Sequence, residues 1–268
     1  MSRAWRTVLA GAVALTAGVR SAPAHDTWLL PDLFDTPPGS RIALELTSGM
    51  AYPEPETAIQ PDRIGRAVLR LAGKTVDIPE RASAAKALRL AIALDDPGIA
   101  TLAVDLEPRT IELTREQVPE YLEEIGAPPA VVEAWNRMPE PKRWRESYVK
   151  HAKTFVRVGE PGADESWAQP LGLALEIVPE KDPTGLHAGD SLPVRVLKGG
   201  EPFAGFTVEL VAAGASADAR QTTDAAGRAT FRLPRAGRWL LRGTEVRASS
   251  RPDADWESDF TTLTLEVR

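Results

Sequence analysis

The feature that most constrains the fold is a succession of short apolar or alternating runs, each ending at a cluster of Gly, Pro or Asp. Runs of this length predict β-strands, and the turn residues between them predict antiparallel returns. The first half contains such runs at residues 41–47, 67–72, 88–94 and 99–106. The second half contains them at the short spacing typical of a β-sandwich, at residues 171–178, 191–197, 207–211, 222–224, 228–233, 238–242 and 260–267. The sequence therefore predicts a mainly β protein.

A helical insertion interrupts this pattern. Residues 114–117 resemble a capping box, because Thr114 can accept an early helix amide and Gln117 can reach back to the Thr114 amide. A helix follows and ends at Gly126, and residues 131–138 and 144–155 also carry helical spacing. We therefore predict a helical insertion over about residues 115–153.

The chain divides at a segment rich in Gly, Pro and acidic residues, residues 159–169, which predicts a linker. We predict two β-sandwich-like domains, residues 25–168 with the helical insertion and residues 169–268 without one. Many short strands can share one core, so the second domain is expected to fold alone.

Residues 1–24 have the order of a cleavable signal peptide. Arginines precede an apolar stretch at residues 7–19, and the small residues Ala22 and Ala24 allow cleavage before His25. The stretch is well short of the roughly 20 residues that a membrane-spanning helix needs. We therefore predict an exported protein, periplasmic or secreted, that does not span the membrane.

Composition excludes several functions. The full chain has a net charge of −6, and removal of the signal peptide with its three arginines makes the mature chain more acidic, at about −9, so we expect no nucleic-acid partner. The chain has no Cys, which excludes disulfides, thiolate metal sites and thiol nucleophiles. It also lacks a Gly-x-Ser-x-Gly elbow, a His-Glu-x-x-His helix and a phosphate-binding Gly-rich loop. We therefore predict no enzymatic activity and no catalytic residues.

Four segments carry a resemblance to a known family: HDTWLLP at 25–31, ESYVKHAKTFVRVG at 146–159, GLALEIVP at 172–179, and the close at 256–267. They resemble an exported, NikM-like family of unknown function that is described as a periplasmic component of nickel and cobalt uptake. The C-terminal strands are similar to the transthyretin-like or carboxypeptidase-regulatory-like sandwich. The resemblance implies a two-domain, mainly β, periplasmic protein with a role in metal handling.

The residues suggest a metal site independently. Cleavage before His25 leaves a free α-amino nitrogen beside an imidazole nitrogen, and the two can chelate one divalent ion. Nitrogen ligands of this kind suit nickel, cobalt or copper, and Asp26 could add an oxygen. His151 is a weaker third candidate, because a ring beside Tyr148 commonly packs and hydrogen-bonds. The alternative is that His25 is simply the first residue of the mature chain.

Six tryptophans remain in the predicted mature chain, at positions 28, 135, 144, 167, 239 and 256. They either stack on a planar ligand or, as we favour, pack in the core, with Trp28 and Trp167 the most exposed.

Two functional hypotheses follow. The first is binding or delivery of a divalent transition metal through His25, as an accessory to an envelope metal transporter. The second is a non-catalytic periplasmic scaffold, adhesion or ligand-binding module without metal.

Overall fold

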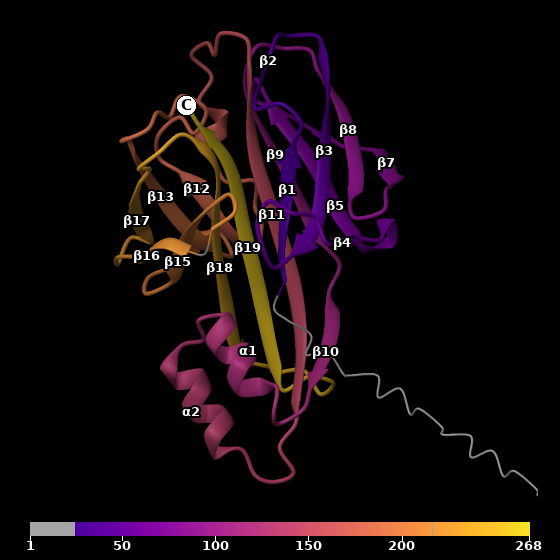
Figure 1. Cartoon of the computed structure of the whole chain (residues 1–268), viewed down its shortest axis with the longest axis vertical. Helices are drawn as coiled ribbons and strands as arrows, with labels where there is room; N and C mark the ends of the chain where they lie inside the picture. Colours follow the sequence, from indigo (N-terminus) through magenta and orange to yellow (C-terminus); the bar gives the residue numbers. More distant parts are fainter. Residues whose placement is uncertain (1–24, 216) are drawn as a thin grey trace, which may run out of the picture.

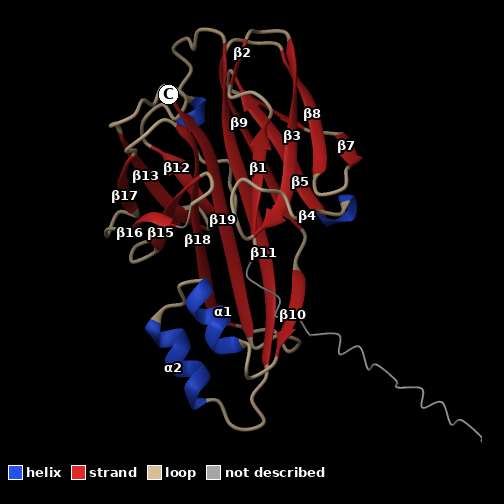
Figure 2. Ribbon diagram, in the orientation of Figure 1, coloured by secondary structure: helices blue, strands red, loops and turns tan. Residues whose placement is uncertain are grey.

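The computed structural model describes residues 25–215 and 217–268, so the predicted signal peptide at 1–24 lies outside the described residues. The prediction of a mainly β fold is confirmed: three sheets dominate the described chain, and two short α-helices gather at one end (Figures 1 and 2). No helix of the described part is long and apolar enough to cross a membrane.

The largest sheet runs through both halves of the sequence. Its central strands are long: β11 (Trp144–Val158) pairs in parallel with β19 (Trp256–Val267), which pairs antiparallel with β18 (Gly237–Ala248). The other strands are β2 (Asp35–Thr36), β5 (Ile64–Leu71), β6 (Lys74–Asp77), β9 (Gly98–Leu106), β10 (Arg109–Leu113), β15 (Thr207–Ala212) and β16 (Ala217–Thr222). The order is β16-β15-β18-β19-β11-β9-β5-β6, with β2 and β10 also paired to β11.

Two smaller sheets cover this large sheet. One has the order β1-β3-β8-β7 with β4 paired to β3, and comprises β1 (Asp26–Pro31), β3 (Ser40–Gly49), β4 (Thr57–Ala58), β7 (Glu80–Ser83) and β8 (Leu88–Leu94). The other comprises β12 (Leu175–Pro179), β13 (Ser191–Lys198), β14 (Glu201–Pro202) and β17 (Arg228–Arg232).

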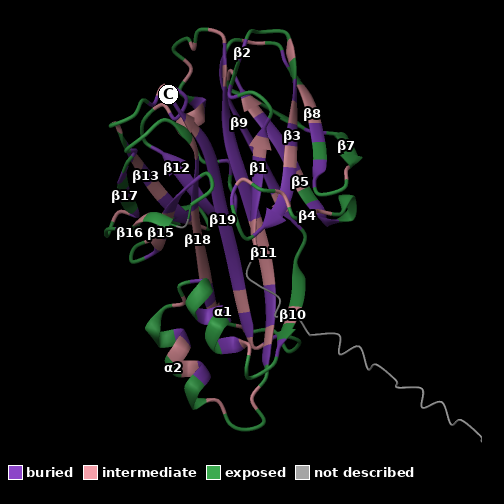
Figure 3. Ribbon diagram, in the orientation of Figure 1, coloured by how far each residue is buried: buried purple, intermediate pink, exposed green. Residues whose placement is uncertain are grey.

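The alternation of side chains along β11 divides them between two hydrophobic cores. Ala152, Val156 and Val158 belong to the core beneath β1, β3 and β8, whereas Phe155 belongs to the core that holds β12, β13 and β17. Because successive residues of a strand point to opposite faces, one strand serves both cores. Figure 3 shows β11 and β19 buried along most of their length. The two sandwiches therefore share their central strands, which the predicted division at residue 168 did not anticipate.

The helical insertion is shorter than predicted. The helices are α1 (Val118–Glu124) and α2 (Pro129–Arg137), but the predicted helix over 144–155 is wrong because these residues form β11. Neighbouring strands pair with β11 on both sides, and tertiary pairing of this kind overrides local periodicity. Half of the predicted capping box is present, since the Thr114 amide donates to the Gln117 side chain at 2.9 Å.

The tryptophans pack. Trp144 stacks on Trp256 with ring centroids 4.5 Å apart, and Trp135 and Tyr121 of the two helices meet its edge. Contrary to the expectation of partial exposure, Trp28 is buried; Trp167 is half-buried against the second core.

The junction between the halves is held by a buried ion pair. Lys153 on β11 donates to Glu176 on β12 at 2.8 Å, and both side chains are almost completely buried. Glu176 also accepts the backbone amides of residues 171–173, and the Arg66 and Arg70 guanidiniums donate to backbone carbonyls of residues 169–171. The end of the linker is thereby attached to both halves.

Candidate functional site

A cavity of about 240 Å³ lies where the first sandwich meets the helical end of the molecule. It is bounded by the beginning of β1, by β4 and the 3₁₀ turn η1 (Pro61–Arg63), by β10 and α1, and by one face of β11 and β19. We call it the basic pocket, because its charged lining residues are Arg63, Arg109 and Lys150, with the imidazole of His25 beside them. None of its lining residues, all within the described chain, is Asp or Glu. A cationic cavity in a chain of net charge −6 is a local reversal of the overall charge.

Arg63 is the most constrained of these cations. Its residue is only 8 % exposed, and its Nε–H has no hydrogen-bond partner among the described residues. The guanidinium carbon lies 5.8 Å from the centroid of the Tyr148 ring, and burial lowers the pKa of Arg63 below its usual value. A buried donor without a partner carries a desolvation cost.

Lys150 comes from β11, two residues after Tyr148 and therefore on the same face. Its Nζ donates to the backbone carbonyl of His25 and lies 5.2 Å from the centroid of the Phe260 ring. Burial lowers the pKa of Lys150 to about 8, although the Asp26 carboxylate opposes this shift. Near neutral pH the ammonium is therefore mostly charged and only partly compensated.

The remaining walls are apolar or carry hydroxyl groups. Thr27 and Ser48 face each other across the β1–β3 pair, and their hydroxyl oxygens are 2.6 Å apart. The apolar part of the wall includes Leu106, Ile111 and Phe260. The cavity thus combines cations with apolar surface, the composition typical of small-molecule sites.

The structure separates the three predicted metal ligands. His25 Nε2 lies 3.5 Å from the Glu56 carboxylate at the basic pocket, whereas Asp26 pairs with Arg242 and lines a second cavity of about 220 Å³. His25 and Asp26 diverge because neighbouring residues of an extended chain point to opposite sides. Within residues 25–215 and 217–268, no group of three or more His, Asp or Glu side chains is arranged to hold a metal ion.

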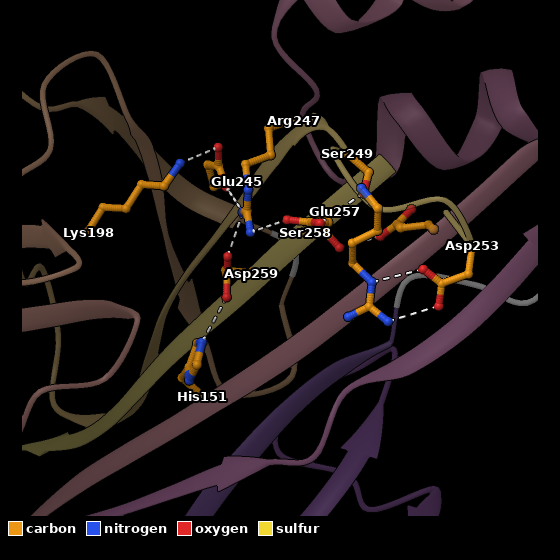
Figure 4. A network of polar contacts seen from close by, with 11 residues as sticks. His151, Lys198, Glu245, Arg247, Ser249, Asp253, Glu257, Ser258 and Asp259 are labelled. Atoms are coloured by element: carbon orange, nitrogen blue, oxygen red, sulfur yellow. Dashed lines mark hydrogen bonds and ion pairs between the residues drawn. The ribbon is translucent and has the colours of Figure 1, made fainter. Parts of the chain in front are cut away.

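His151 lies in a chain of ion pairs on the opposite face of β11 from Lys150. Its Nδ1 is 2.6 Å from Asp105 and its Nε2 is 3.2 Å from Asp259. Asp259 pairs in turn with Arg247, which also contacts Glu245 and Glu257; Figure 4 shows this part of the network.

Burial by itself would lower the pKa of His151. The hydrogen bonds and charges of Asp105 and Asp259 outweigh burial and raise the pKa to about 9. The ring is therefore protonated at neutral pH, and an imidazolium has no lone pair to give to a metal. The geometry favours a structural charge at His151.

Sequence reasoning missed the cations of the basic pocket. The predicted helix over 144–155 includes Tyr148 and Lys150, whereas a strand over 144–158 puts both on one face. No sequence pattern identifies Arg63, because it reaches the pocket from a short 3₁₀ turn.

Comparisons with solved structures give matches of low similarity. The D0-D1 domain of Intimin matches at 13% identity over 89% of this chain and 96% of that chain, with a TM-score of 0.24. The Biofilm associated protein BSP domain matches at 11% over 89% of this chain and 30% of that chain, with a TM-score of 0.21, and murine CEACAM1b at 9% over 91% and 99%, with a TM-score of 0.22. TM-scores of this size support no argument about function.

The search of curated proteins gave no significant match. A family model, in contrast, matches residues 22–244, which is most of the chain. The chain therefore belongs to the DUF4198 family, whose description is a domain of unknown function.

Proposed function

We propose that this protein is an exported, non-catalytic ligand-binding module whose basic pocket binds a small anionic molecule. The main observation behind the proposal is Arg63, a buried guanidinium in a cavity whose lining residues, among those that the structure describes, include further cations and no carboxylate. Export rests on the predicted signal peptide, and the non-catalytic role rests on the missing catalytic motifs in the sequence.

Electrostatics supports an anionic ligand. Positive charges gathered in a partly buried cavity repel one another, and the low local polarity strengthens both this repulsion and the attraction to an anion. An anion bound between Arg63 and Lys150 would remove this repulsion and supply hydrogen-bond acceptors. Charge-assisted hydrogen bonds are among the strongest that proteins form.

The test is calorimetric titration with phosphate, sulfate, citrate and benzoate. We expect saturable binding of at least one anion that weakens as the salt concentration rises. The variant Arg63→Met should weaken binding by about tenfold or more, since it removes a charged hydrogen-bond donor. The control Arg89→Met removes an exposed arginine that pairs with Glu45 elsewhere and should leave binding unchanged. Absence of binding by every anion would refute the proposal.

The metal hypothesis remains a second candidate, since His25 Nε2 lies 3.5 Å from the Glu56 carboxylate. Cleavage before His25 would add the α-amino nitrogen, giving two nitrogen ligands and one oxygen ligand for Ni(II), Co(II) or Cu(II). Delivery to an envelope metal transporter, as the NikM-like resemblance implies, depends on this site.

Titration of Ni(II) and Cu(II) tests this second candidate. We expect binding by protein that begins at His25, and a large loss both for His25→Ala and for a form extended by one Gly before His25. The extended form keeps the imidazole but converts the amine into a peptide amide. Affinity should also fall at acidic pH, where protons compete for the nitrogens. Equal binding by the processed and extended forms would contradict the chelate.

A further inference from the structure

We infer that the ligand of the basic pocket is a carboxylate carried on a flat, apolar body of about the size of one aromatic ring. This inference rests on the proposed function and narrows it from small anions in general to one chemical class. The charged residues of the pocket, the apolar surface of its walls and its volume support this inference.

The charged side chains of the pocket suit a ligand that carries one carboxylate. Arg63 is buried and Lys150 half-buried, whereas Arg109 is exposed and borders the pocket from β10. A carboxylate can accept two hydrogen bonds from one guanidinium edge, and the Arg63 side chain is buried at the pocket wall. Lys150 provides a compact second cation, held by the carbonyl of His25.

The walls match an apolar body. Tyr148 and Phe260 meet edge to face, with ring centroids 6.2 Å apart and planes at 78°, so they form a corner of two aromatic surfaces. Ile111 and Leu106 add aliphatic surface to the same cavity. Aromatic corners of this kind favour a planar ring, which can stack on one surface and meet the edge of the other.

Three hydroxyl groups of the wall already have hydrogen-bond partners. The Thr27 and Ser48 hydroxyls bond to each other, and Tyr121 donates its hydroxyl to Glu146 outside the pocket. These groups therefore place little demand for hydrogen bonds on the ligand body.

The volume fits the same class. A cavity of about 150 Å³ holds a benzene molecule in a well-studied engineered protein, so the 240 Å³ of the basic pocket has room for one ring and a carboxylate.

Inorganic phosphate fits these features less well. It would leave the aromatic and aliphatic walls in contact with water, and as a dianion it would need a second fully charged partner. The ammonium of Lys150 is the available second partner inside the pocket, and its burial makes that charge costly.

Calorimetric titration with four probes separates the alternatives. Benzoate has the charge and the ring, benzamide keeps the ring without the charge, acetate keeps the charge without the ring, and phosphate has charge alone. We expect benzoate to bind at least tenfold more tightly than each of the other three. Binding of phosphate or acetate as tight as that of benzoate would overturn the aromatic class while leaving anion binding in place, and binding of benzamide as tight as benzoate would overturn the carboxylate.

Variants test whether the ring lies in this pocket. Phe260→Leu keeps an apolar side chain but removes the aromatic surface. Ile111→Ala shortens the aliphatic wall at a partly buried side chain that packs against the cluster containing Phe260. Each variant should weaken the binding of benzoate by about threefold to tenfold and leave the binding of acetate unchanged. Circular dichroism checks that each variant is folded. Arg89→Met is the matched control, at an exposed arginine that does not line the pocket. Unchanged benzoate binding in Arg63→Met and in both wall variants would overturn the site, and failure of all four probes and of citrate and sulfate would overturn the proposed function itself.

Discussion

His151 shows how a residue's partners decide its role. The sequence makes His151 a candidate metal ligand, but Asp105 and Asp259 hold both of its ring nitrogens. Its side chain is only 3% exposed, so these charges act with little screening by water. The protonated ring therefore stabilises the folded state.

His151 predicts a specific dependence of stability on pH. Because the pKa of His151 is raised from 6.5 to about 9, its contribution is fully present below pH 6.5 and is lost as the pH rises through 9. This rise in the pKa corresponds to a contribution of about 3 kcal/mol to the free energy of unfolding. Urea unfolding from pH 6 to pH 10 should show that wild type loses this stability relative to His151→Gln.

The difference in the free energy of unfolding between wild type and His151→Gln separates the effect of His151 from that of Lys150, which titrates in the same pH range. The lowered pKa of Lys150 acts in the opposite direction, raising stability between pH 8 and pH 10.5, but it is present in both proteins and cancels. Parallel curves for wild type and His151→Gln would contradict the assignment of a charged His151.

At the scale of the element, β1 is an edge strand whose free edge is satisfied by side chains. The Thr262 and Thr264 hydroxyls of β19 donate to the backbone carbonyls of Thr27 and Leu29, each at 2.6 Å. These bonds replace the missing neighbouring strand and fix β1 over β11 and β19. They also hold the segment that brings His25 and Thr27 to the basic pocket.

Replacing these hydroxyls should therefore loosen β1. We expect Thr262→Val and Thr264→Val each to lower the free energy of unfolding by about 1–3 kcal/mol, because each leaves a buried carbonyl without its donor. Amide exchange in β1 should accelerate. Thr101→Val is the matched control, since the Thr101 hydroxyl is buried without a partner and its removal should be neutral or stabilising. Equal costs for all three variants would show that the hydroxyl bonds do not matter.

At the scale of the whole molecule, the two halves are joined by backbone pairing. Strand β11 and strand β19 pair in parallel over nine residues of each, and Ile99 and Phe155 of the first half enter the second core. The segment that connects the two halves reaches the surface at Glu160, whose side chain is 97% exposed. The connection can therefore be cut without removing the contacts that hold the halves together.

Limited digestion with a glutamate-specific protease tests this arrangement. We expect the first cut after the exposed Glu165, because Pro161 protects the bond after Glu160. We expect the two fragments to elute together in gel filtration until denaturant separates them. Separate elution without denaturant would contradict a shared sheet. The independent folding of residues 169–268 stays a prediction, which circular dichroism of that fragment tests; such a fragment would lack Phe155 from its core and β11 beside β19.

Patterns along the sequence are enough to predict the mainly β class, because short apolar runs bounded by turn residues leave few other ways to bury apolar surface. The sequence also located the two short helices and the hydrogen bond that the Thr114 amide donates to the Gln117 side chain, which depend on residues close in the chain. Local interactions of this kind can be inferred from local sequence.

The other features depend on contacts between distant parts of the chain. Residues 144–158 became a strand because β9 and β19 pair with them from distant parts of the chain. The basic pocket likewise depends on Arg63, Arg109 and Lys150, which three separate elements bring together. A fold class can be inferred from patterns along the chain. A binding site depends on the distances in space between residues that are far apart in the sequence, and the sequence contains no direct measure of those distances.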